Sequence, residues 1–123
     1  MRLLLDTHVA LWWLAGSARL TARARAAIEE AGAHAVVSAA SVWEAAIKRA
    51  AGKLQSSDLS DAAAAAGLTF LGIDEHHAKL AGSLPPIHRD PFDRMLVAQA
   101  MTGGLPIVTA NRNIAKYDVR VIW

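Results

Sequence analysis

Five short runs of apolar residues recur along the chain, and stretches with helical periodicity separate them. The runs cover residues 2–6, 34–38, 68–73, 106–110 and 119–123. Continuous apolar runs this short are typical of strands buried on both faces of a parallel sheet. Strands that alternate with helices predict an α/β fold, a three-layer α/β/α sandwich with a mostly parallel central sheet. With 123 residues, the chain is expected to form a single domain over residues 1–123.

Helix start and stop signals lie between these runs. The expected helices cover residues 7–16, 20–32, 39–52, 57–67, 74–84 and 90–104, and residues 111–118 are expected to form a loop. Asp74 and Asp90 are expected N-caps, and either Ser57 or Asp58 caps the alanine-rich helix. Pro91 directly follows Asp90, at the first helical position, where proline is favoured.

The composition excludes several kinds of chemistry. The chain has no cysteine, which excludes disulfides, cysteine-bound zinc and thiol nucleophiles. Any metal must therefore be bound by oxygen or imidazole, which favours hard cations such as Mg²⁺ or Mn²⁺. The formal net charge of +2 is compatible with a nucleic-acid partner but does not by itself indicate one.

The N-terminal segment MRLLLDTHVALWWLAG superficially resembles a signal peptide. Asp6 and His8 interrupt its apolar part, and no small-residue cleavage pattern follows, so export is not expected. No apolar run approaches the roughly 18 residues of a membrane span. We therefore expect a cytoplasmic protein without a membrane partner.

Acidic residues gather at one end of the predicted sheet. Asp6 ends the first strand, and Glu44 lies in the first turns of the helix after the second strand. Asp90 and Asp93 open the helix that leads into the fourth strand, and Asn111 follows that strand. Because the crevice of a parallel α/β sheet lies at the carboxyl ends of its strands, these side chains are expected to meet there. A buried carboxylate is costly unless a positive group neutralises it, which indicates a shared divalent cation.

Each acidic position also has a purely structural interpretation. Asp6 is a suitable N-cap for the first helix, and Glu44 forms an i,i+4 pair with Lys48. Asp90 and Asp93, within HRDPFDR, resemble a capping box at the positive end of a helix. The structural interpretation is favoured for each residue alone, but their joint position at one sheet edge favours a metal site.

Four segments together resemble the PIN-domain ribonucleases and, more narrowly, the VapC-type toxins of bacterial toxin–antitoxin pairs. They are LLLDTHVALWWL, VVSAASVWEAAIK, HRDPFDRMLVAQA and IVTANRNIAKYDVRVIW. The resemblance spans nearly the whole chain. It implies an α/β/α sandwich whose clustered acidic residues bind Mg²⁺ or Mn²⁺, and a metal-dependent endoribonuclease that hydrolyses RNA phosphodiester bonds.

The resemblance assigns site residues position by position. Asp6, Glu44 and Asp93 match the acidic positions of the family, and we expect them to hold the metal directly or through water. One of these catalytic carboxylates accepts the proton of the attacking water. Asp90 is expected to be a further ligand, a neighbour of the ligands or only a helix cap. Asn111 stands where many relatives have aspartate, and the lost negative charge favours a single bound metal.

Hydroxyl and basic side chains complete the expected site. Thr7 and Thr109 are expected to order water beside the metal. Positive charge around the acidic residues would bind RNA, and the candidates are Lys48, Arg49, Arg89, Arg94 and Arg112. Of these, Lys48 and Arg94 are favoured because each is close in sequence to an expected ligand. His88, a lone loop histidine, is expected to contact neither the metal nor the RNA.

The tryptophans are interpreted as packing residues. Trp12, Trp13 and Trp43 are expected in the core or at an interface rather than as base-stacking residues. The segment VALWWL has apolar residues on more than one helix face, which suggests an exposed hydrophobic patch for a partner. The resemblance implies a homodimer and a separately encoded cognate antitoxin, whose C-terminal segment would cover the acidic cleft.

Two other functions fit an α/β fold with clustered carboxylates. A phosphatase or receiver-like domain would need its own motif around the first aspartate, but Asp6 lacks the D-x-D continuation because Thr7 and His8 follow it. A non-catalytic RNA-binding or interaction module, with an acidic site made degenerate by Asn111, stays open. The three remaining carboxylates favour the nuclease over this module.

Overall fold

The computed structural model describes residues 2–55 and 58–123 of the chain. Its strands form one sheet, in the order β3-β2-β1-β4-β5, in which every neighbouring pair is parallel. The strands are β1 (Leu3–Leu5), β2 (Ala35–Ser38), β3 (Thr69–Leu71), β4 (Ile107–Val108) and β5 (Val121–Ile122). Each predicted apolar run therefore contains a strand, and each strand is shorter than its run because the end residues turn into the connections.

Helices connect consecutive strands. The α-helices are α1 (Thr7–Ala15), α2 (Ala22–Ala31), α3 (Ala39–Ala50), α4 (Leu59–Ala65), α5 (Glu75–Ser83) and α6 (Pro91–Gly103). Two short 3₁₀ helices, η1 (Gly32–His34) and η2 (Ile114–Lys116), are also present. The second lies in the segment predicted as a loop, since a single 3₁₀ turn is too short to show an apolar period. In the described ranges, no helix is both long enough and apolar enough to cross a membrane.

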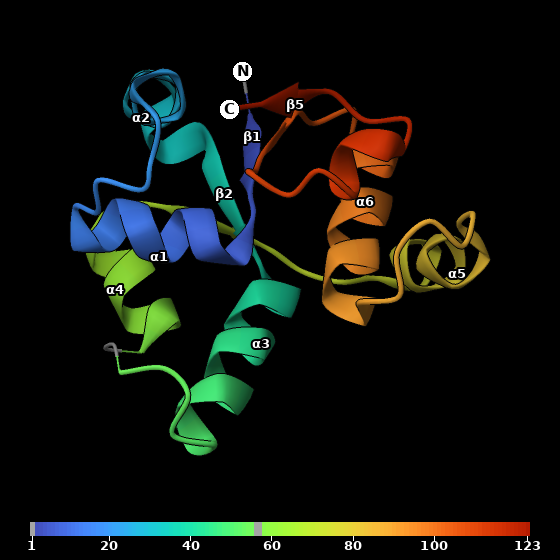
Figure 1. The fold of residues 1–123 in the computed structure, drawn as a ribbon, viewed down its shortest axis with the longest axis horizontal. Helices are drawn as coiled ribbons and strands as arrows, with labels where there is room; N and C mark the ends of the chain where they lie inside the picture. Colours follow the sequence, from blue (N-terminus) through green and yellow to red (C-terminus); the bar gives the residue numbers. More distant parts are fainter. Residues whose placement is uncertain (1, 56–57) are drawn as a thin grey trace.

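The helices cover both faces of the sheet. Leu3 and Leu5 of β1 pack into a buried cluster with apolar residues of α1, α2 and α4. Leu4, on the opposite face of the same strand, packs with residues of α6 and with Ile114 of η2. Figure 1 shows α1, α2 and α4 on one side of the strands and α5 and α6 on the other. The predicted three-layer α/β/α sandwich with a parallel sheet is confirmed.

The helix caps expected from the sequence are largely present. Asp74 accepts a hydrogen bond from the backbone N–H of His77 at 2.9 Å and so caps α5. Asp58 caps α4 by accepting a hydrogen bond from the backbone N–H of Asp61 at 3.1 Å. The alternative cap, Ser57, lies outside the described residues.

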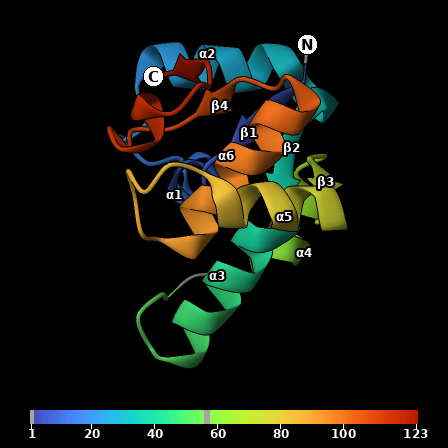
Figure 2. The same ribbon diagram turned by 90° about the vertical axis from the view of Figure 1, so that its right-hand side faces the viewer.

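A buried glutamine fixes α6 against the sheet. The Gln99 side chain accepts a hydrogen bond from the Ser38 hydroxyl at the end of β2, and its amide donates to the Gly72 carbonyl at 3.2 Å, just after β3. A fully buried amide left without partners would be costly, so these contacts hold the helix in place. Figure 2 shows α5 and α6 side by side in front of the strands, while α3 extends past the end of β2.

Candidate functional site

A cavity of about 530 Å³ lies at the carboxyl ends of the central strands. Its lining comes from the end of β1 and the start of α1, from the α1–α2 connection, from α3, from the start of α6 and from the loop after β4. The lining residues are Asp6, His8, Trp12, Arg19, Glu44, Lys48, His88, Asp90, Asp93, Ala110 and Asn111. The acidic residues singled out in the sequence therefore meet in one cavity, as a parallel sheet predicts.

Asp6 leaves β1 as a buried carboxylate. It occupies the N-cap position of α1, but its side chain makes no capping hydrogen bond. Its Oδ2 instead accepts a 2.7 Å hydrogen bond from the hydroxyl of Thr109, which follows β4. Burial raises the pKa of Asp6, and the hydrogen bond from Thr109 opposes that rise. Asp6 is therefore the N-cap residue by position, as one interpretation of the sequence expects, but its carboxylate does not cap the helix and lines the cavity instead.

Glu44 enters the cavity from the second turn of α3. Its side chain is 8% exposed, and its Oε2 lies 3.0 Å from the Nζ of Lys48. The i,i+4 pair expected from the sequence is thus present. It differs from an ordinary surface pair because the carboxylate is buried, and buried charges are screened less by salt. Lys48 therefore offsets part of the negative charge of the cavity.

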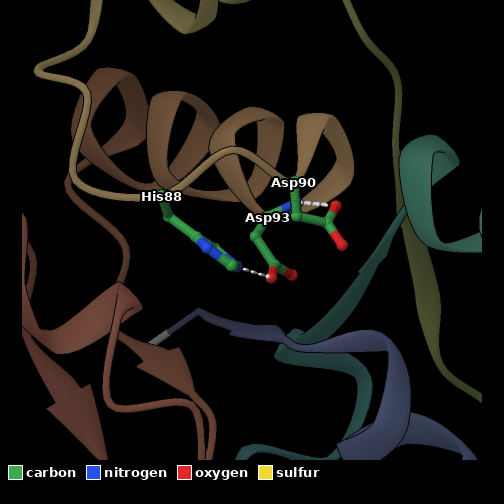
Figure 3. A group of neighbouring side chains, drawn as sticks. All are labelled: His88, Asp90 and Asp93. Carbon is green, nitrogen blue, oxygen red and sulfur yellow. Dashed lines mark hydrogen bonds and ion pairs between the residues drawn. The ribbon is translucent and has the colours of Figure 1, made fainter.

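Asp93 is held from two sides. Its Oδ2 lies 2.8 Å from the His88 Nε2, and it accepts a 3.1 Å hydrogen bond from the side-chain amide of Asn111. The pKa of Asp93 is raised to about 6, chiefly by burial and also by the negative charges of Asp6 and Asp90. The contact with His88, drawn in Figure 3, acts in the opposite direction. His88 was expected to contact neither metal nor RNA, and its contact with Asp93 was not anticipated from the sequence.

Asp90 is the cap of α6. Its Oδ1 accepts hydrogen bonds from the backbone N–H groups of Phe92 at 2.8 Å and Asp93 at 3.2 Å, with Pro91 at the first helical position. Figure 3 shows His88, Asp90 and Asp93 grouped at the start of this helix. Each of the three offers a possible ligand atom within 4.8 Å of the others. Capping uses Oδ1, so it does not exclude Asp90 from binding an ion.

The two threonines expected to order water are engaged within the protein. The Thr7 hydroxyl donates to the Ser41 hydroxyl at 2.8 Å, between α1 and α3. The Thr109 hydroxyl donates to Asp6 and accepts from the backbone N–H of Asn111 at 2.9 Å. The contacts of Thr109 position Asp6, and those of Thr7 join two helices, while their expected role in ordering water stays a prediction.

Asn111 lies in the cavity lining with both ends of its side chain bonded. Its amide donates to Asp93, and its Oδ1 accepts a 2.9 Å hydrogen bond from the backbone N–H of Asn113. In this arrangement the side-chain carbonyl oxygen of Asn111 is hydrogen-bonded to the backbone N–H of Asn113. Asn111 thus orients Asp93, a contact that an aspartate could make only when protonated.

The basic candidates for RNA binding lie in different surroundings. Lys48 lines the cavity. Arg49 lies 3.5 Å from Asp58 in a surface ion pair. Arg89 and Arg112 are exposed and, within the described residues, outside the cavity lining.

Arg94 has a structural role. Its guanidinium donates to the Tyr117 hydroxyl and to the carbonyls of four residues, Ala81, Leu84, Pro85 and His88. Arg94 was a favoured RNA-binding candidate, but these contacts engage its guanidinium within the protein, and it is not among the residues that line the cavity. It is adjacent to Asp93 in sequence, but successive residues of a helix point in directions about 100° apart. The side chain consequently faces the α5–α6 connection and not the cavity.

The exposed apolar side chains are not gathered on α1, where a patch was expected. Leu11, Trp13 and Leu14 pack against the core cluster beneath that helix. Trp43 on α3 is instead 62% exposed, and its ring meets that of Phe92 edge-on at 5.1 Å. The apolar surface around Trp43 therefore lies beside the start of α6.

Five residues of the lining were not site candidates in the sequence. They are His8, Trp12, Arg19, His88 and Ala110. His8 and Trp12 are four residues apart, one turn along the helix that begins after Asp6, and this spacing of two aromatic rings was the available signal. Arg19 lies in the connection between α1 and α2, where the sequence carries no such signal.

The donor set suits a hard divalent cation. Asp6, Glu44 and Asp93 are all buried, and the raised pKa values of Asp6 and Asp93 reflect burial with too little positive charge nearby. Carboxylate oxygens with one imidazole available are ligands that Mg²⁺ and Mn²⁺ accept. An ion between these carboxylates would also reduce their mutual repulsion.

Comparison with known sequences places this site in a family. The sequence matches the PIN domain over residues 3–120, a range that contains the whole acidic cavity. The chain belongs to the PIN domain family. The resemblance seen in the sequence segments is thereby confirmed for the PIN domain. A search of curated proteins gave no match.

Solved structures share the fold of this PIN domain over almost its full length. DNA-bound VapBC from Salmonella typhimurium is 19% identical, with a TM-score of 0.69, and 98% of this chain and 96% of that chain are covered. A toxin–antitoxin complex from Klebsiella pneumoniae is 18% identical, with a TM-score of 0.69 and the same coverage. VapBC2 from Rickettsia felis, bound to a promoter DNA fragment, is 11% identical, with a TM-score of 0.71 and coverage of 98% and 97%. At these identities the likeness establishes a common fold.

Proposed function

We propose that this PIN domain is a metal-dependent endoribonuclease and acts as the toxin of a toxin–antitoxin pair. The observation that carries the proposal is the grouping of Asp6, Glu44 and Asp93, three buried carboxylates, in one open cavity. Uncompensated buried carboxylates are costly, and a divalent cation is the partner that suits oxygen donors. Membership of the PIN family, with its resemblance to ribonucleases, supports the same conclusion.

The reaction proposed is hydrolysis of an RNA phosphodiester bond. Asp6, Glu44 and Asp93 would hold Mg²⁺ or Mn²⁺, directly or through water, with Asp90 beside them. When bound, the ion acidifies water and stabilises negative charge on the phosphoryl oxygens. One of the three carboxylates accepts the proton of the attacking water while the bond from phosphorus to the leaving ribose oxygen breaks.

The contacts around the carboxylates keep them oriented before RNA arrives. Thr109 fixes Asp6 through Oδ2, while His88 and Asn111 fix Asp93 through its own Oδ2. Groups that are already oriented need no reorganisation when charge develops in the transition state. Lys48, in the lining, supplies positive charge next to the carboxylates.

The fold comparison supports an antitoxin partner. The solved structures that share this fold are described as VapBC or toxin–antitoxin complexes. We therefore propose a cognate antitoxin protein as the partner, with the PIN domain acting as a homodimer in the cytoplasm on an RNA substrate. Arg49, Arg89 and Arg112, exposed outside the lining, are candidates for contacts with more distant parts of the RNA.

Cleavage assays test the chemistry. The wild-type protein should cleave single-stranded RNA with Mg²⁺ or Mn²⁺ and not with EDTA, and Asp93→Asn should lose at least about 100-fold in rate, since it removes a metal ligand. Asp61→Asn, an exposed change on α4, is the matched control and should cleave like the wild type. Cleavage in EDTA, or equal cleavage by Asp93→Asn, would contradict the mechanism.

Expression in bacterial cells tests the toxin role. The wild-type protein should arrest growth, and Asp6→Ala should relieve the arrest at equal protein level. Growth arrest that persists in Asp6→Ala would show that toxicity does not depend on the acidic site.

One observation favours a second candidate function. Asn111 replaces a carboxylate of the family pattern, and its carbonyl oxygen is bonded to the backbone of Asn113. A non-catalytic RNA-binding or interaction module with a degenerate acidic site would have this feature. Such a module binds RNA without cutting it under any divalent metal, so the same cleavage assay separates the two functions.

A further inference from the structure

We propose that His8, Trp12 and Arg19 form a nucleotide-binding wall beside the acidic residues. An unpaired RNA base would stack on the rings of His8 and Trp12, and Arg19 would bind a neighbouring phosphate. The proposal rests on the proposed ribonuclease function and deepens it by naming where single-stranded RNA is held. All three residues line the cavity that contains Asp6.

The two rings of this wall lie one helical turn apart on α1. The ring centroids of His8 and Trp12 are 6.0 Å apart with planes inclined by 42°, and Trp12 also contacts the Trp123 ring at 6.0 Å. His8 is exposed and Trp12 is half-buried, so ring surface is open at the cavity. Aromatic rings beside a charged groove bind unpaired bases with little sequence preference, because every base has a flat π face.

Core packing does not account for Trp12. Within the described residues, it belongs to neither hydrophobic core cluster, whereas its neighbour Trp13 packs against the cluster beneath α1. Of the two places expected for Trp12, in the core or at an interface, the core is not the one observed. Its position after Asp6 instead places an indole within the same cavity as a proposed metal ligand.

Arg19 supplies the charge. Within residues 2–55 and 58–123, neither an ion pair nor a hydrogen bond engages its guanidinium, and the residue is exposed. Lys48, also in the lining, is paired with Glu44. A guanidinium free at the rim can form two parallel hydrogen bonds with a phosphate group.

The salt dependence of RNA binding tests Arg19. Binding of a short fluorescent single-stranded RNA is measured by anisotropy in EDTA, so that cleavage does not interfere, over a series of NaCl concentrations. Arg19→Gln should weaken binding and reduce the slope of log K against log salt by about 0.7, as expected for one lost phosphate contact. Arg23→Gln, an exposed change on α2 outside the lining, should leave the slope unchanged.

Abasic RNAs test the stacking. Removing one base at a time should weaken binding to the wild type about 5- to 100-fold at the position that contacts the rings. Trp12→Leu should bind the intact and abasic RNAs alike, while Trp43→Leu, which changes an exposed tryptophan of α3, should keep the wild-type profile. His8→Phe should keep the discrimination and His8→Ala should reduce it. Because His8 is exposed, these two variants do not depend on the core remaining intact.

The outcomes separate this proposal from the proposed function. If Arg19→Gln, His8→Ala and Trp12→Leu all bind like the wild type, the wall is not a nucleotide site, even where wild-type RNA cleavage is observed. If the variants lose binding as expected but the wild type never cleaves RNA, the nucleotide-binding wall is supported and the proposed ribonuclease function is contradicted.

Discussion

Asp93 is a residue whose charge state couples the site to the stability of the fold. Its pKa is raised from 3.8 to about 6, chiefly by burial, so the folded protein binds the proton more tightly than the unfolded chain. The resulting stabilisation is complete below pH 3.8 and is lost as the pH rises through about 6. The ionised carboxylate that the proposed metal site needs is therefore kept at a cost to stability at neutral pH.

This coupling predicts the pH dependence of unfolding without metal. Asp93 should make the free energy of unfolding of the wild type in EDTA about 1 kcal/mol higher at pH 5 than at pH 7. Urea unfolding at the two pH values measures this difference. Asp93→Asn should reduce that difference, because the amide does not titrate, while the exposed control Asp61→Asn should retain it. An unchanged pH dependence in Asp93→Asn would show that Asp93 titrates in its ordinary range.

At the scale of elements, the first turn of α6 combines two functions. Asp90 holds the backbone of this turn, and Asp93 extends from it into the cavity. The positive end of a helix favours both carboxylates, and the cap fixes where the helix begins. A change that disturbs the cap therefore acts on the site through the backbone.

Two substitutions at Asp90 separate the cap from the charge. Asp90→Ala should lower the free energy of unfolding by about 1 kcal/mol, because two backbone N–H groups lose their acceptor. Asp90→Asn should stay within about 0.5 kcal/mol of the wild type, since asparagine caps equally well. Calorimetric titration of Asp90→Asn with Mn²⁺ then shows whether the lost negative charge weakens metal binding. A large loss of affinity in Asp90→Asn would make Asp90 a ligand.

The connection between α5 and α6 depends on Arg94. Replacing it with methionine should destabilise the protein by about 2–3 kcal/mol in urea unfolding, because several carbonyl oxygens lose a charged donor. Arg89→Met, an exposed change in the same connection, should cost less than about 0.5 kcal/mol. Equal stability of the two variants would contradict the structural role of Arg94.

The elements were more predictable from the sequence than the side-chain contacts of the site. Leu3–Leu5 and the Asp90–Pro91 helix start are local patterns, and parallel topology then brings Asp6 and Asp93 to one cavity. The direction of Arg94 depends on where the α5–α6 connection passes, which is a tertiary property. The place of Arg19 in the lining likewise depends on how α1 and α2 are joined.

At the scale of the whole molecule, the cavity is assembled from segments far apart in the chain. Buried like charges from these segments oppose each other in the folded state, and an ion that binds only the folded state relieves them. Folding and metal binding should therefore be coupled.

Thermal unfolding at pH 7 tests this coupling. Mn²⁺ at about 100 times its dissociation constant should raise the free energy of unfolding by about 2.7 kcal/mol, seen as a higher melting temperature. NaCl of equal ionic strength should give little increase, and Asp93→Asn should respond more weakly to Mn²⁺ than Asp61→Asn does. A melting temperature independent of Mn²⁺ would argue against an ion in this cavity.

The hydrogen bond between Asp6 and Thr109 joins residues 103 positions apart. The ribosome therefore adds Thr109 and Asn111 more than 100 residues after Asp6. A nascent chain that stops before β4 lacks the strand that pairs with β1 on this side and the groups that orient Asp6 and Asp93. The proposed nuclease would therefore stay inactive until β4 and the residues after it have been made, and the unfinished chain would not cut the messenger that encodes it.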